Sequence, residues 1–135
     1  SRTNSFFKNN VEELYRLGCA TIHNENTFYN FNEFKVKKEK LDNLLSKNKI
    51  GFIKIDVEGH ELEVIDGSLN LIMENKPILL VEIEEKHTKK KVSETITKIN
   101  KLGYASYFFD ENNLKSTVFL KSSSNFNNFI FEYKS

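Results

Sequence analysis

Two short apolar runs with a helical pattern between them constrain the fold of this chain most. The first, residues 52–57, is rich in β-branched side chains and lies between Gly51 and Gly59, which is typical of a strand. The second, residues 78–83, is almost entirely apolar, as in a strand buried on both faces of a parallel sheet. Between them, apolar side chains recur every three or four residues, which predicts one amphipathic helix. These side chains belong to Leu62, Ile65, Leu69 and Ile72.

The alternation of strand and helix continues towards the end of the chain. Val92, Ile96 and Ile99 predict a second helix that ends at Gly103, and residues 104–109 predict a third strand. Strand, helix, strand, helix and strand at this spacing predict two crossover units, and hence a parallel sheet with helices on its faces. Two further strands, at 117–120 and 129–133, predict an antiparallel pair after it. We therefore expect an α/β fold in which residues 51–135 form a βαβαβ core plus a β-hairpin.

The first fifty residues carry weaker patterns, and we expect an irregular N-terminal segment of the same domain, 1–135. Asn10 and Glu13 resemble a capping box, which predicts a helix over 10–17. Residues 21–33 have no period and predict a loop, and residues 34–37 alternate like an edge strand. Three leucines then predict one or two helical turns. They are Leu41, Leu44 and Leu45.

Composition excludes several classes of function. The formal net charge of +1 gives no field that would attract nucleic acid or an anionic membrane, so we expect neither as a partner. The longest apolar run, Ile78 to Val81, is far shorter than the ~20 residues of a membrane-spanning helix. The single cysteine, Cys19, cannot form a disulfide within the chain, which indicates a reducing, cytoplasmic setting.

Acidic side chains followed by a histidine stand at the ends of both apolar strands. The first strand leads into Asp56, Glu58 and His60, and the second leads into Glu82 and His87. Ligands of open parallel sheets bind beyond the carboxyl ends of the strands, so this edge is the candidate site. Asp56 or His60 is suited to remove a proton from a hydroxyl group near neutral pH.

Structural interpretations of the same residues stay open. Asp56 or His60 could instead cap the helix that starts near residue 60. Glu61 and Glu63 are expected on the solvated face of that helix, and the glutamates at 82, 84 and 85 could be surface charges balanced by lysines. A divalent cation held by the strand-end carboxylates, as in a metal-dependent hydrolase, is a further alternative, but we predict no metal site. Asp56 and Glu58 share one face only if the strand continues through both.

The run FIKIDVEGHELEVIDGSLNLI, followed by KPILLVEI, resembles the FkbM family of S-adenosylmethionine-dependent methyltransferases. The resemblance extends over about residues 19–133 and is clearest over 41–84. It implies a Rossmann-like sheet in which 52–57 is the fourth strand and 78–83 the fifth. It also implies methyl transfer from S-adenosylmethionine to a hydroxyl oxygen of a sugar or natural-product acceptor. Asp56, Glu58 and His60 would then be catalytic, with Glu82 and His87 binding the small-molecule acceptor.

The sequence departs from that family in its cofactor loop. The glycine-rich loop and the acidic residue after the second strand have no counterpart, because the glycines at 18, 51, 59, 67 and 103 are too far apart. The chain therefore resembles the carboxyl-terminal half of a methyltransferase, incomplete relative to a full domain, and its cofactor-binding residues are not identified. An alternative function is a non-catalytic remnant or interaction module. We expect residues 1–50, a second copy in a homo-oligomer, or another partner to cover the unpaired edge of strand 52–57.

Overall fold

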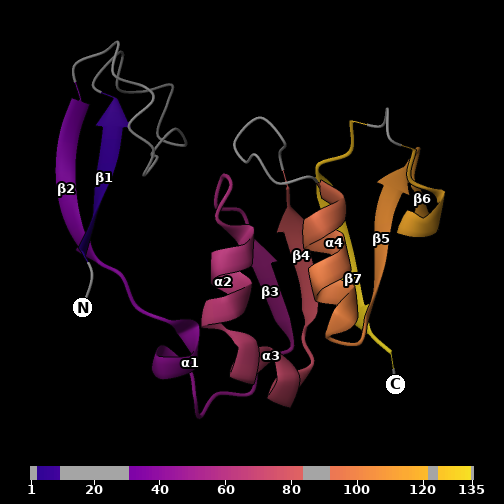
Figure 1. The fold of residues 1–135 in the computed structure, drawn as a ribbon, viewed down its shortest axis with the longest axis horizontal. Helices are drawn as coiled ribbons and strands as arrows, with labels where there is room; N and C mark the ends of the chain where they lie inside the picture. Colours follow the sequence, from indigo (N-terminus) through magenta and orange to yellow (C-terminus); the bar gives the residue numbers. More distant parts are fainter. Residues whose placement is uncertain (1–2, 10–30, 84–91, 122–124, 135) are drawn as a thin grey trace. The chain divides into compact units, whose positions relative to one another are not determined.

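The computed structural model describes residues 3–9, 31–83, 92–121 and 125–134, with side chains from residue 36 onward. The chain divides into two compact units, Ser1–Glu39 and Lys40–Ser135. Figure 1 labels the helices and strands of both units, and each unit is described here by itself.

The first unit contains an antiparallel pair of strands, β1 (Thr3–Asn9) and β2 (Phe31–Lys37). Thr3 lies opposite Lys37 and Asn9 lies opposite Phe31, so the two strands pair along their whole length. The predicted strand at 34–37 is confirmed, but it begins at residue 31, where we had expected a loop. Strand β1 was not expected, because its sequence alternates too weakly to mark a strand without its partner. The predicted helix over 10–17 lies outside the described residues.

The second unit is a mixed α/β structure with one five-stranded open sheet. Its helices are α1 (Leu41–Leu44), α2 (Glu61–Gly67), α3 (Leu69–Asn75) and α4 (Val92–Lys101), with a 3₁₀ turn, η2 (Thr117–Phe119). Its strands are β3 (Phe52–Ile55), β4 (Ile78–Glu82), β5 (Tyr104–Asp110), β6 (Asn113–Ser116) and β7 (Asn128–Tyr133). These bounds confirm the predicted helical turns around Leu41 and the predicted strands β3 and β4. They also confirm the predicted helix α4, which ends before Gly103.

The strand order is β3-β4-β7-β5-β6, which differs in two respects from the predicted sheet (Figure 1). The predicted antiparallel pair of the last two strands is not formed, because β6 pairs with β5 and β7 pairs with β4 and β5. Strands β3 and β4 pair in parallel, whereas β7 is antiparallel to both β4 and β5. Strands β3, β4 and β5 thus run in one direction, as predicted, but the last strand of the chain lies between β4 and β5. Phe129 and Phe131 of β7 are fully buried, as expected of a strand in the middle of a sheet.

Two further predictions in this unit were wrong. The expected strand at 117–120 is the 3₁₀ turn η2, and the strand lies earlier, at β6, because Glu111 and Asn112 turn the chain back at once. The expected single helix after β3 is two helices that meet at Ser68. The hydroxyl of Ser68 donates to the carbonyl oxygen of Val64 at 2.7 Å, so it ends α2 instead of continuing the helix.

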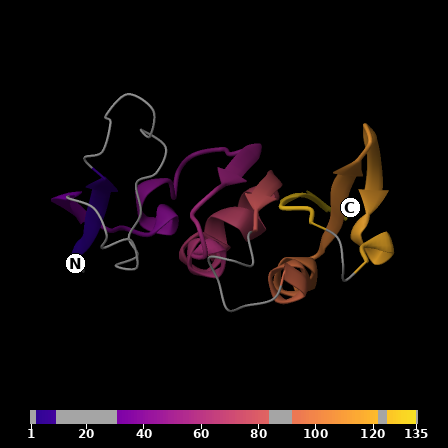
Figure 2. The ribbon, with the colours of Figure 1, turned by 90° about the horizontal axis from the view of Figure 1, so that it is seen from above.

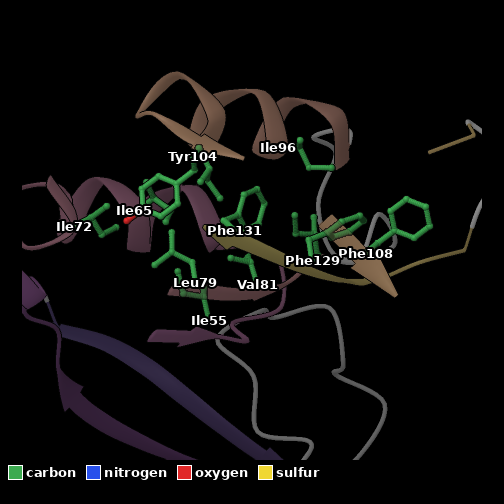
Figure 3. Packing of buried hydrophobic residues seen from close by; sticks show 12 residues of the cluster. Ile55, Ile65, Ile72, Leu79, Val81, Ile96, Tyr104, Phe108, Phe129 and Phe131 are labelled. Atoms are coloured by element: carbon green, nitrogen blue, oxygen red, sulfur yellow. The ribbon is translucent and has the colours of Figure 1, made fainter. Parts of the chain in front are cut away.

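The core lies between the helices and one face of the sheet. Leu79, Val81, Phe129 and Phe131 alternate with outward-facing residues on β4 and β7 and are fully buried. Figure 3 shows them beside Ile55 and under the side chains that the helices contribute. Those from the helices are Ile65 of α2, Ile72 of α3, and Ile96 and Ile99 of α4. A buried aliphatic side chain of this size contributes roughly 1.5–3 kcal/mol, so this layer holds β3 and β4 in place.

The opposite face of the sheet is less covered than the sequence predicted. Figures 1 and 2 show α2 and α4 on the same side of the sheet. Across the other face, Leu80, Ile130 and Tyr107 lie side by side and are only half-buried. Ile78 is 44% exposed, so β4 is not buried on both faces. Within the described residues, helices therefore pack on one face of the sheet and not on both.

Helix α3 receives its N-terminal cap from a distant residue. The carboxylate oxygens of Asp42, in α1, accept the backbone N–H groups of Leu71 at 2.9 Å and of Asn70 at 3.2 Å. These N–H groups belong to the first turn of the helix, where no carbonyl of the helix can reach them. Asp42 thereby ties α1 to the helix pair that leads from β3 to β4.

Candidate functional site

The acidic ends of β3 and β4 lie next to each other, as predicted. The two strands pair in parallel with Ile55 opposite Val81. Asp56 directly follows β3, and Glu82 is the last residue of β4, so the two carboxylates lie at the same carboxyl edge of neighbouring strands. Asp56 is exposed and Glu82 is half-buried, which leaves both accessible to a ligand.

A lysine of β3 is bound to the first of these carboxylates. Lys54 Nζ lies 3.0 Å from Asp56 Oδ2. The hydrogen bond that Lys54 donates to Asp56 and the negative charge of Asp56 raise the pKa of Lys54, and the charge of Glu82 adds to the effect. Lys54 is therefore a cation at neutral pH. One oxygen of Asp56 is engaged by this cation, and an ionised carboxylate still has lone pairs for a second donor.

The chain leaves the edge through a turn with left-handed backbone. Glu58 has φ +48° and Gly59 has φ +97°. Glycine adopts such a conformation without strain, but for Glu58 it costs about 1–2 kcal/mol. Both residues are half-buried, and His60 follows at the N-cap position, directly before α2.

The predicted cap of α2 is not made by the residues that we considered. His60 occupies the N-cap position, but its side chain makes no capping hydrogen bond. Asp56 is bound to Lys54. The structure therefore does not support the alternative that Asp56 or His60 serves as the cap of this helix.

Glu61 is the residue that the sequence analysis missed. We placed it on the solvated face of the helix, yet it is only 2% exposed, and its Oε1 accepts the N–H of Gly59 at 2.8 Å. Glu63, two residues on, is exposed as expected. A buried carboxylate is rare unless it is bound to a donor, and the only sequence signal for this one was its position two residues after a glycine.

The structure does not place the remaining predicted residues of the site. His87 lies outside the described residues, as do Glu84 and Glu85. Within the described ranges, no group of three or more His, Cys, Asp or Glu side chains could hold a metal ion. In the same ranges, no helix has the length and apolarity to cross a membrane.

Comparison with known families decides what kind of domain carries this edge. Residues 7–106, well over half of the chain, match the model of the methyltransferase FkbM domain. The chain belongs to the FkbM methyltransferase family. The matched range contains β3, β4 and the turn between β3 and α2, and it ends within β5. No curated protein and no solved structure matches the chain.

Family membership gives the acidic edge its context. In this FkbM methyltransferase domain, Asp56, Glu58 and Glu82 lie at the carboxyl edge of the parallel pair, where α/β sheets bind their ligands. The carboxylates place oxygen atoms at this edge that can accept hydrogen bonds. The buried Glu61 supports the turn that carries Glu58.

Proposed function

We propose that this chain transfers a methyl group from S-adenosylmethionine to a hydroxyl oxygen of a small acceptor, such as a sugar or a natural product. One observation carries the proposal: Asp56, directly after β3, and Glu82, at the end of the neighbouring parallel strand β4, lie at one edge of a domain of the FkbM methyltransferase family. We assign the sheet to the Rossmann-like class and the reaction to the cytoplasm. Support comes from the common direction of β3, β4 and β5 and from the single cysteine.

The chemistry requires a base beside the acceptor. A hydroxyl oxygen attacks a methyl group well only if its proton leaves during the reaction, and a placed carboxylate or imidazole that takes the proton accelerates such a step by about 10²–10⁴. Asp56, Glu58 and His60 are the candidates for this catalytic role. Glu82 would accept a hydrogen bond from a second hydroxyl of the acceptor and fix its orientation, and His87 is proposed to act with it.

The methyl donor would supply an electrophilic methyl group. In the family that the sequence resembles, a glycine-rich loop holds the donor, and the separated glycines of this chain offer no such loop. The described residues therefore fit the acceptor side of the reaction. The donor's amino-acid and ribose parts are not assigned to any of them.

Calorimetric titration tests the proposal. S-adenosylmethionine and its demethylated product, S-adenosylhomocysteine, are each titrated into the protein. We expect saturable heat that fits one binding site per chain. If neither compound produces binding heat at millimolar concentration, the catalytic proposal fails for this chain.

A matched pair of variants then assigns the base. With a panel of hydroxylated sugars and labelled donor, Asp56→Asn should lower the rate of methyl transfer by about 10²–10⁴. Asp66→Asn removes the same charge from an exposed position of α2, where Asp66 pairs with Lys98 at 2.7 Å. This control should retain the rate. Equal losses in both variants would contradict the role of Asp56.

A further inference from the structure

Four residues other than glycine have a left-handed backbone in the described part of the chain. They are Glu58, Lys76, Glu111 and Asn112. Three of them have a plain structural reason. Lys76 ends α3, with its N–H bonded to the carbonyl of Ile72, and helices often end on a left-handed residue. Glu111 and Asn112 form the two-residue loop between β5 and β6, which requires positive φ at both positions.

Glu58 has no such reason. It ends no helix and belongs to no two-residue hairpin loop, because it lies between β3 and the start of α2. Glycine would adopt the same φ without strain, and glycine does occupy the next position. Strained backbone of this kind persists where the surrounding structure holds it, and it is concentrated at functional sites.

One contact that holds this turn comes from Glu61. Its carboxylate is buried and accepts the N–H of Gly59 at 2.8 Å, so it closes the segment directly after Glu58. Because Glu61 lies in the first turn of α2, the helix dipole favours its negative charge. A hydrogen bond to an ionised acceptor is also stronger than a neutral one.

We infer that Glu61 is a positioning residue, whose buried carboxylate holds the turn at Glu58 and Gly59 and so fixes where the Glu58 carboxylate stands at the acceptor edge. This inference rests on the proposed function for the use of that edge. The turn itself can be measured without any ligand, so the two can fail separately.

Hydrogen exchange of the Gly59 amide, followed by NMR on the full chain, tests the contact. In Glu61→Ala the Gly59 amide should exchange at least about tenfold faster than in the native protein, which corresponds to roughly 1.4 kcal/mol. Glu61→Gln keeps an acceptor oxygen and should restore most of the protection. Glu63→Ala, an exposed glutamate in the same helical turn, should leave the amide unchanged.

A reference amide separates positioning from general stability. The N–H of Leu79, in the buried strand β4, should exchange at the native rate in the Glu61→Ala variant if only the turn is released. If Glu61→Ala does not fold, Glu61→Asp takes its place, because the shorter side chain cannot reach Gly59 without moving the helix. Equal acceleration at Gly59 and Leu79, or no acceleration at Gly59, would overturn the inference.

Methyl transfer from labelled donor to the panel of hydroxylated sugars supplies the functional readout. We expect the rate to fall about tenfold or more in Glu61→Ala and to recover in Glu61→Gln. If the native protein transfers no methyl group, the proposed function fails, and the exchange pattern still decides the role of Glu61. If the native protein is active and Glu61→Ala is equally active, the positioning role is refuted.

A second substitution isolates the link to Glu58. Glu58→Gly should relax the turn, so the additional replacement Glu61→Ala should accelerate exchange at Gly59 by less than it does in the native background. Equal acceleration in both backgrounds would show that Glu61 does not act on the conformation of Glu58.

Discussion

The cap that Asp42 places on α3 gives the sharpest test of how the second unit is held together. Its two carboxylate oxygens accept the N–H groups of Leu71 and Asn70. Asp42→Ala leaves both donors in the first turn without this acceptor. Replacing a capping side chain by alanine costs about 0.5–2 kcal/mol, and losing a negative charge at a helix N-terminus costs about 0.3–1 kcal/mol. We therefore expect a loss of about 2 kcal/mol.

Urea unfolding of the full chain measures this loss. With a slope of about 1–2 kcal/mol per molar urea, the midpoint should fall by about 1–2 M while the slope stays the same. Asp42→Asn keeps one acceptor oxygen and should lose about half as much free energy of unfolding.

Asp66→Ala is the matched control, because it also removes one aspartate from the same unit. Asp66 is exposed and forms only a surface ion pair with Lys98, which contributes at most about 1 kcal/mol. The reasoning is refuted if the Asp42→Ala and Asp66→Ala midpoints shift equally, or if the Asp42→Ala midpoint does not move.

Two further predictions concern β5 and the turn before it. Burial raises the pKa of Tyr104 from its ordinary value of 10.0 to about 12. At pH values between these two, the hydroxyl is protonated in the folded chain and ionised in the unfolded chain. Stability should be complete below about pH 10 and fall as the pH rises towards 12, and Tyr104→Phe should weaken that fall in urea titrations at several pH values. Gly103 has φ +96°, and an added Cβ would lie 2.9 Å from Tyr133 Cε2. Gly103→Ala should cost about 1–2 kcal/mol or more, whereas Gly51→Ala, with open space around it, should change the melting temperature little.

Several helices and strands could be predicted from the sequence, because their signals lie within the segments themselves. Apolar runs and helical periods gave β3, β4, β5 and α4 nearly as observed. The position of β7 could not be predicted, since its pairing with β4 and β5 joins segments far apart in the chain. The break at Ser68 was hidden for a different reason. The apolar period runs through it, and only the side-chain bond to Val64 shows that the helix ends there.

The candidate site shows the same division. Asp56 and Glu82 could be placed at one edge from the direction of two parallel strands alone, and the register confirms it. Glu61 was predicted to be exposed, because charged residues are seldom buried. Its contact with Gly59 depends on a left-handed turn that no sequence pattern predicted. The catalytic roles of Asp56, Glu58 and His60 stay predictions.

The most direct test of the central claim is a titration of the ¹⁵N-labelled protein with hydroxylated sugars in the presence of S-adenosylhomocysteine, followed by NMR. If the carboxyl edge of β3 and β4 is a methyltransferase site, the largest chemical-shift changes should fall on residues 56–60 and on Glu82. Saturable changes confined to other parts of the chain, or no change at millimolar ligand, would contradict the account.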